Sequence, residues 1–223
     1  MTKREGILFV VSAPSGAGKT TLCHQLMATV EGLRHSISYT TRQLREGEVN
    51  GRDYHFVDEA MFRRMIERDE FVEWASVYGK QYGTPRRPLE QSLRDGNDML
   101  LEIDVQGAEQ VRKKYSQGVF IYILPPSLGV LQARLHLRGR DSAEEIERRL
   151  SQVKEEVKSW RAYDYVVRND DVKQALRELD AIVTAERLRA KRMDKTWIDD
   201  FLSDSQAGTV DAGSGAARRR TEA

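Results

Sequence analysis

The sequence predicts an α/β fold with three layers, in which helices cover both faces of a parallel sheet. The first observation is three apolar segments, residues 6–11, 99–104 and 119–124, with the continuous hydrophobic character of strands buried on both faces. The second is the alternation of these segments with helical patterns, which is typical of strand–helix–strand units. Residues 163–167 (YDYVV) add a short fourth strand.

A glycine-rich loop directly follows the first strand. Residues 12–22 read SAPSGAGKTTL, and Gly18-Lys19-Thr20 fits the end of the phosphate-binding loop pattern, with Ala13 at its first position. An apolar repeat at helical spacing comes next, so strand, loop and helix occur in the required order. The alternative is a glycine-rich turn with a solvated lysine. The context favours a phosphate loop, and therefore the fold class of the P-loop NTPases.

The residue types in this loop suit phosphate chemistry. Gly16 and Gly18 can adopt backbone conformations closed to other residues, so successive N–H groups can converge on phosphate oxygens. The amino end of the following helix adds its positive dipole. Lys19 can follow a transferred phosphoryl group, and the Thr20 hydroxyl can coordinate Mg²⁺.

Composition excludes several classes of protein. With 36 basic and 35 acidic residues the net charge is +1, whereas a general nucleic-acid binder would be more basic. Cys23 is the single cysteine, so we expect no internal disulfide, a reducing compartment and a small apolar role behind the loop. The amino-terminal apolar stretch is too short for a signal peptide or a membrane span. We therefore expect a cytoplasmic protein without membrane or nucleic-acid partners.

Two regions interrupt the alternation. Residues 37–90 have the pattern of a small mixed insertion of short strands around one helix. Residues 126–159 are helical and rich in arginine, which predicts a lid. The core then comprises residues 1–36, 91–125 and 160–203. Residues 204–223 are rich in Gly, Ala and Ser, which predicts a disordered tail.

The insertion contains candidates for a second ligand site. Arg42 and Arg45, followed by Tyr54, could grip a phosphate through guanidinium forks and a phenol, although they read equally well as surface groups. Glu73 lies in EFVEWA, a strand expected to be half-buried. A carboxylate there could accept two hydrogen bonds from adjacent N–H and NH₂ donors, as guanine presents, and the alternative is a surface glutamate.

Charged groups near the strand ends and in the lid complete the candidate set. Glu102 and Asp104 close the second strand, at the edge where open α/β sheets bind ligands, and could hold Mg²⁺ through water or contact a second substrate. Mobile arginines can stabilise charge during phosphoryl transfer, and the alternative is a charged helix face. The lid arginines are Arg134, Arg138, Arg140, Arg148 and Arg149.

Taken in order, the segments APSGAGKT, SYTTR, GEVNGRDYHFV, EFVEWA, YGTP, LLEIDVQG and RLHLRGR resemble the guanylate kinase family. The match spans about residues 6–189. The resemblance implies a P-loop core with a GMP-binding insertion and a lid, and the Mg²⁺-assisted reaction of ATP with GMP to give ADP and GDP. It also implies a role in guanine nucleotide metabolism.

The resemblance also implies roles for single residues. Guanine would be read by Ser38, Glu73 and Thr84, with Asp104 nearby. The GMP phosphate would be bound by Arg42, Arg45, Tyr54 and Tyr82. ATP would contact Ala13, Pro14, Ser15, Gly16, Ala17, Gly18, Lys19, Thr20, Arg134, Arg138 and, near adenine, Asn169. Catalysis would fall to Lys19, Arg42, Arg134, Arg138 and Arg149, and Mg²⁺ to Thr20 with Glu102 or Asp104 through water.

Two other functions fit parts of the sequence. Scaffold proteins carry related domains that lack a working phosphate loop and bind proteins, but the intact Gly18-Lys19-Thr20 argues against this here. A kinase for another phosphorylated substrate is the second alternative, and Glu73 with Ser38 favours guanine instead. The sequence leaves the oligomeric state open, a homo-oligomer included.

Overall fold

We describe a computed structural model of the chain, covering residues 4–77, 79–137, 143–193 and 195–207. Its central sheet has the strand order β2-β7-β1-β8-β9, and all neighbouring strands are parallel. The strands are β1 (Leu8–Ser12), β2 (Leu33–His35), β7 (Asp98–Glu102), β8 (Val119–Leu124) and β9 (Tyr165–Arg168). The expected parallel sheet is confirmed, and β2 is an additional edge strand.

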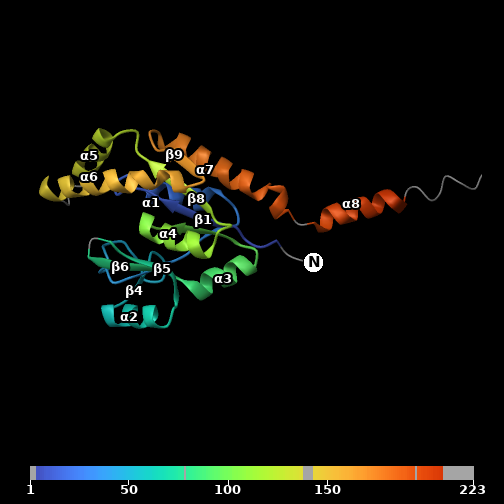
Figure 1. Ribbon diagram of the computed structural model, residues 1–223, viewed down its shortest axis with the longest axis horizontal. Coiled ribbons are helices and arrows are strands. Elements are labelled where there is room, and N and C mark those ends of the chain that lie inside the picture. Colours follow the sequence, from blue (N-terminus) through green and yellow to red (C-terminus); the bar gives the residue numbers. More distant parts are fainter. Residues whose placement is uncertain (1–3, 78, 138–142, 194, 208–223) are drawn as a thin grey trace, which may run out of the picture.

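Helices cover both faces of this sheet (Figure 1). On one face α1 (Lys19–Thr29) and α7 (Val172–Arg187) pack against apolar side chains of the strands, and Cys23 is fully buried there. On the other face α3 (Arg86–Arg94) and α4 (Val105–Lys114) pack against the alternate side chains. Strands buried on both faces need continuous apolar runs, as the sequence has, so the three-layer prediction is confirmed.

The insertion forms a second sheet with the order β4-β3-β6-β5. Its strands are β3 (Tyr39–Thr40), β4 (His55–Phe56), β5 (Phe71–Val77) and β6 (Lys80–Pro85). Helix α2 (Glu59–Glu67) covers this sheet, with Phe62 stacked on Phe71 at 4.7 Å between ring centroids. The insertion therefore has a small core of its own, below the central sheet in Figure 1.

The segment that the sequence predicts as a lid lies on the opposite side of the view, above the central sheet (Figure 1). It comprises α5 (Leu128–Leu137) and α6 (Ala143–Val157), followed by the 3-10 helix η1 (Lys158–Ala162). Leu131 and Leu135 of α5 pack against Ile146 and Val153 of α6. The two helices thus share an apolar contact.

The chain continues beyond α7 into a short 3-10 helix, η2 (Ala190–Arg192), and α8 (Thr196–Ala207). Helix α8 extends away from the body (Figure 1) and runs four residues past position 203, where we expected the core to end. Residues 208–223 of the expected tail lie outside the described residues. Within the part of the chain that the structure describes, no helix has the length and apolar character needed to cross a membrane.

Candidate active site

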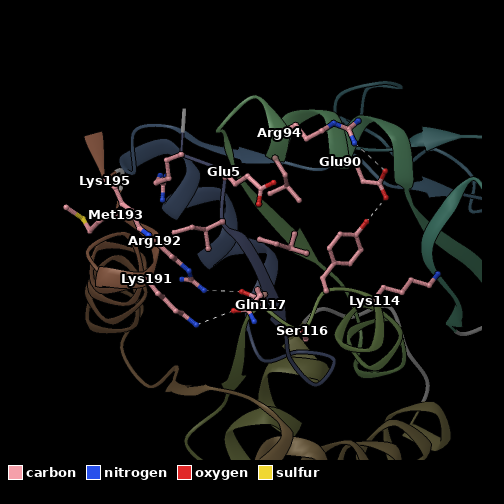
Figure 2. Close-up of a pocket in the computed structure, with 17 residues that line it drawn as sticks. Glu5, Glu90, Arg94, Lys114, Ser116, Gln117, Lys191, Arg192, Met193 and Lys195 are labelled. Atoms are coloured by element: carbon pink, nitrogen blue, oxygen red, sulfur yellow. Dashed lines mark hydrogen bonds and ion pairs between the residues drawn. The ribbon is translucent and has the colours of Figure 1, made fainter. Parts of the chain in front are cut away.

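Two large cavities lie at opposite edges of the central sheet. The carboxyl-edge cavity, of about 370 Å³, is lined by the phosphate loop, the insertion and α6. The amino-edge cavity, of about 760 Å³, is lined by the segment entering β1, the end of α3, the turn before β8 and residues near α8 (Figure 2). Both fall within the size range of small-molecule sites, so the chemistry of their walls must distinguish them.

The larger, amino-edge cavity is basic, but most of its cationic side chains have partners in the protein. Arg4 donates to Asp98 at 2.7 Å, and Arg192 pairs with Glu186, a buried carboxylate. Lys191 and Arg192 both reach Gln117, as the dashed lines in Figure 2 show. These cations hold the fold together at this edge, and the described residues of the wall include no phosphate-type loop.

The carboxyl-edge cavity contains the loop that joins β1 to α1. Gly16 and Gly18 have φ angles of 91° and 92°, a left-handed region that disfavours side chains. A Cβ on Gly16 would lie 2.9 Å from Leu131 in the lid, and one on Gly18 would lie 2.4 Å from the Asn169 amide nitrogen. The loop therefore requires glycine at both positions, as the phosphate-loop prediction demands.

Lys19 and Thr20 start α1 next to the end of β7. The Lys19 Nζ donates to the carbonyl oxygen of Ile103 at 2.9 Å and lies 3.9 Å from Glu102. The Thr20 hydroxyl donates to the Glu102 carboxylate at 2.5 Å. The amino end of a helix, a lysine and a carboxylate thus meet at one point of the cavity wall.

The oxygen donors at this point fit a small divalent cation. A threonine hydroxyl and a carboxylate are hard ligands of the kind Mg²⁺ uses beside substrate phosphates. Glu102 is better placed than Asp104, because Asp104 accepts the Gly107 N–H at 2.8 Å as the cap of α4. The two acidic residues that the sequence could not separate therefore have different local tasks.

The Glu73 carboxylate is buried beside Thr84, its cross-strand neighbour in the insertion sheet. Thr84 donates to it at 2.5 Å, and only 3% of Glu73 is exposed. Burial raises the pKa of Glu73 to about 7, and the charge of Asp104 contributes in the same direction. Glu73 nevertheless lines the carboxyl-edge cavity, so it is not the surface glutamate of the alternative reading.

Helix α4 comes close to this carboxylate. A Cβ on Gly107 would lie 2.5 Å from Glu73 Oε2, so glycine is needed for α4 to pack against β5. Thr84 itself is fully buried and does not line the cavity. Its observed contact holds Glu73 in place, and Ser38, Tyr54 and Tyr82 line the same cavity.

The two candidate phosphate-binding arginines of the insertion, Arg42 and Arg45, differ in their surroundings. Arg42 donates twice to Glu48, at 2.7 and 2.9 Å, and its guanidinium lies 5.3 Å from the centre of the Tyr54 ring. The hydrogen bonds to Glu48 are the main cause that raises the pKa of Arg42. Arg45 lines the cavity, whereas Arg42 lies outside its wall. An incoming phosphate would therefore meet Arg45 directly and must compete with Glu48 for Arg42.

The lid contributes one face of α6 to the cavity. Arg149, Gln152 and Glu156 line it, at spacings of three and four residues that place them on one side of the helix. Burial is the main cause that raises the pKa of Glu156, and the negative charge of Asp104 raises it further. Arg134 instead donates to the backbone oxygen of Asn169 at 3.1 Å. Arg138 and Arg140 lie outside the described residues.

Several cavity residues were missed by sequence reasoning. The spacing of Gln152 and Glu156 from Arg149 was a usable signal, because the three share a helix face. Gln106 and Ser76 carried no comparable signal, since the insertion and α4 meet only in the folded chain. Glu48 was visible in the sequence, but its pairing with Arg42 was not.

The comparisons with known proteins agree with this geometry. A family model described as "Guanylate kinase" matches residues 5–186. The guanylate kinase of Geobacter metallireducens is 48% identical over 199 residues, covering 89% of this chain and 98% of the relative. That of Bradyrhizobium diazoefficiens is 50% identical over 191 residues, covering 85% and 87%.

A solved structure extends the likeness to three dimensions. The crystal structure of guanylate kinase from Anaplasma phagocytophilum matches with a TM-score of 0.75 at 34% identity, covering 93% of this chain and 98% of that chain. The family resemblance of the motifs is thus confirmed over nearly the whole length. The phosphate loop, the buried Glu73 and these matches together show that the chain belongs to the guanylate kinase family.

Proposed function

We propose that this chain transfers the γ-phosphate of ATP to GMP at the carboxyl-edge cavity, giving ADP and GDP. It is an ATP:GMP phosphotransferase, as its family membership indicates. One observation carries the location of the site: a single cavity contains both the Lys19 phosphate loop and the buried Glu73 carboxylate. One feature suits a triphosphate and the other a base with paired donors.

The three parts of the chain have separate tasks in this proposal. The core holds ATP through the loop at residues 13–20. The insertion at residues 37–90 holds GMP, with Ser38 and Glu73 on the base and Arg45, Tyr54 and Tyr82 on the phosphate. The lid at residues 126–159 brings Arg149 over the reacting groups, and all these side chains line the cavity.

The transfer needs no covalent intermediate on the protein. An oxygen of the GMP phosphate is already charged and forms the new bond to the γ-phosphorus, while the bond to the β,γ-bridging oxygen breaks. The electron pair of that bond leaves with ADP. The chain must align the two phosphates, neutralise their charge through Lys19 and Arg149, and exclude water as the lid closes.

Mg²⁺ is the cofactor in this proposal. Thr20 would hold it directly and Glu102 through water, because these oxygens meet beside Lys19. When bound, the ion would supply positive charge that offsets the negative charge of the phosphates.

Guanine selection rests on the protonation of Glu73. Only the ionised carboxylate accepts hydrogen bonds from both the ring N–H and the exocyclic NH₂ of guanine. Because burial raises the pKa of Glu73 to about 7, the empty site is partly protonated near neutral pH. GMP binding then releases a proton, and a base without these two donors leaves the Glu73 carboxylate with only its contact to Thr84.

We further propose that the chain acts in the cytoplasm. Its cysteine, Cys23, is buried, and burial raises the pKa of the thiol, which suits a packed side chain rather than a disulfide. The partners in this proposal are ATP and GMP, and assembly into a homo-oligomer stays open. The scaffold-type alternative is disfavoured by the intact Lys19, Thr20 and Glu102 arrangement.

A coupled ADP-release assay with ATP and Mg²⁺ tests the proposed activity. GMP, dGMP, AMP, UMP and CMP are supplied in parallel to the folded protein. Turnover confined to the guanine nucleotides is the expected result. Turnover with another base would move the substrate, and the absence of turnover would favour a protein-binding module.

A further inference from the structure

Asn169 follows β9 and is almost completely buried, with 2% of the residue exposed. Its Nδ2 donates to the backbone oxygen of Ala17, inside the phosphate loop, at 2.7 Å. The family resemblance places this position near adenine, yet the observed side-chain contact is with the loop. We propose that Asn169 is a positioning residue that fixes the Ala17–Gly18 peptide of the loop and joins it to the lid arginine Arg134.

The hydrogen bond controls the direction of a phosphate-binding group. In a trans peptide the C=O and N–H point to opposite sides. When Asn169 holds the Ala17 carbonyl, the Gly18 N–H must therefore face away from Asn169. Gly18 is the N-cap of α1 and has a φ of 92°, and its lack of a side chain leaves this peptide freer to rotate.

Packing makes the contact specific. A Cβ on Gly18 would lie 2.4 Å from Asn169 Nδ2, which means that the amide occupies the space that glycine leaves open. The side-chain amide also has only one favourable orientation, because reversing it would place Oδ1 against the Ala17 oxygen. Glycine at position 18 and asparagine at position 169 thus fit each other.

The backbone of the same residue holds two further elements. The Asn169 N–H donates to the Leu124 oxygen at the end of β8, at 2.7 Å. The backbone carbonyl oxygen of Asn169 accepts a hydrogen bond from the guanidinium of Arg134 in α5 at 3.1 Å. Asn169 is therefore a junction of the phosphate loop, the sheet edge and the lid, and a change at its side chain should alter how the loop is presented.

This inference depends on the proposed role of the phosphate loop, and its test separates the two. The Asn169→Asp variant keeps the shape but replaces the Nδ2 donor by an oxygen facing the Ala17 carbonyl. We expect kcat/KM for ATP to fall at least about tenfold, with KM for GMP within about twofold of the wild-type value. Asp170→Asn, in an exposed ion pair with Arg168, is the matched control and should leave both unchanged.

The decisive readout compares ATP with GTP as phosphate donor. A residue that positions the loop should lower kcat/KM for the two triphosphates by the same factor, because both use the same loop. A loss confined to ATP would overturn the inference in favour of an adenine contact, and unchanged kinetics with both would also overturn it. Failure of the loop proposal itself would instead show as retained turnover in Lys19→Ala, whatever position 169 does.

A second variant guards against misfolding. If Asn169→Asp does not give the wild-type circular dichroism spectrum, Asn169→Ser removes the amide without adding a charge, and the same comparison of ATP with GTP decides. In ¹⁵N-labelled protein without nucleotide, the Gly18 amide signal should shift in a folded variant. An unmoved Gly18 signal would contradict the inference.

Discussion

The two edges of the central sheet both carry a cavity, and the larger one is not the proposed active site. At the amino edge, about 760 Å³ is lined by cations that already pair with groups such as Asp98, Glu186 and Gln117. At the carboxyl edge, about 370 Å³ combines a glycine loop, Lys19 and a buried carboxylate. The volume and positive charge of a cavity therefore identify a ligand site less well than the chemical groups on its wall do.

The two edges differ in how many hydrogen-bond partners their charged side chains have within the protein. The amino-edge cations stabilise the fold, since Asp98 also accepts the Ile7 N–H at 2.7 Å and pairs with Arg187. At the carboxyl edge, the Glu73 carboxylate is desolvated and accepts a side-chain hydrogen bond from Thr84. A buried carboxylate with few hydrogen bonds raises the free energy of the site. A base with matching donors lowers that free energy when it binds, because it supplies the missing hydrogen bonds.

The largest expected effect on kcat comes from removing Lys19 from the carboxyl-edge cavity. Lys19→Ala should lower kcat about 100- to 1000-fold, because it removes a cation from the transferred phosphoryl group. KM for GMP should stay within about twofold, because the base and its phosphate use the insertion. Steady-state kinetics with varied GMP measure both quantities.

The matched control is Lys191→Ala, which removes a lysine from the amino-edge cavity. Its kcat should stay within about twofold of the wild-type value. Near-normal turnover in Lys19→Ala would refute the role of the loop lysine, and a large loss in Lys191→Ala would break the contrast between the edges.

The next largest effect is expected at Glu73 of the carboxyl-edge cavity, with Glu90 of the amino-edge cavity as the control. Glu73→Gln should lower kcat/KM for GMP about 10- to 100-fold, because an amide turns an NH₂ donor toward the donors of guanine. KM for ATP should not change. Glu90→Gln at the amino edge should leave both constants unaltered, and an unchanged preference among nucleoside monophosphates in Glu73→Gln would remove the base-recognition argument.

The third effect is a pH dependence with a defined sign. Burial raises the pKa of Glu73 to about 7, and only the ionised form accepts both guanine donors. kcat/KM for GMP should therefore be constant above this pKa and fall about tenfold per pH unit well below it. A pH–rate profile from pH 5.5 to 8.5 measures this, and Glu73→Gln should lack the transition. A transition that persists in that variant would assign the titration to another group.

The smallest effect is a change of stability without a change of activity. The Tyr115 hydroxyl donates to Glu90 at 2.8 Å in the amino-edge cavity. Tyr115→Phe should lower the free energy of unfolding by about 1 kcal/mol while kcat and both KM values stay the same. Urea unfolding with parallel kinetics checks this. Altered kinetics would show that the two edges are coupled.

Strand content was largely predictable from sequence, and strand ends were less so. Strand β8 occupies the predicted residues 119–124, because an uninterrupted apolar run has clear ends. Strand β7 starts at Asp98 rather than at residue 99, since this carboxylate is buried by ion pairs with Arg4 and Arg187 from distant parts of the chain. Strand β2 was missed because Leu33–His35 is short and two of its three residues are polar.

The candidate site shows the same limit. The loop glycines, Lys19 and Thr20 were predictable because their chemistry is local in the sequence. The sequence predicted a half-buried strand at Glu73. It did not predict the full burial of this side chain, because that depends on the close approach of Gly107 in α4 to β5. The Arg42–Glu48 pair and the Asn169–Ala17 hydrogen bond depend on folded geometry, which residue types alone do not specify.

The most direct test of the contrast between the edges is amide hydrogen exchange with and without GMP plus a non-hydrolysable ATP analogue. The account predicts slower exchange in residues 15–20 and 73–84, around the carboxyl-edge cavity. It also predicts unchanged exchange in residues 114–118, at the amino edge. Protection of residues 114–118, with none in the phosphate loop, would contradict the account.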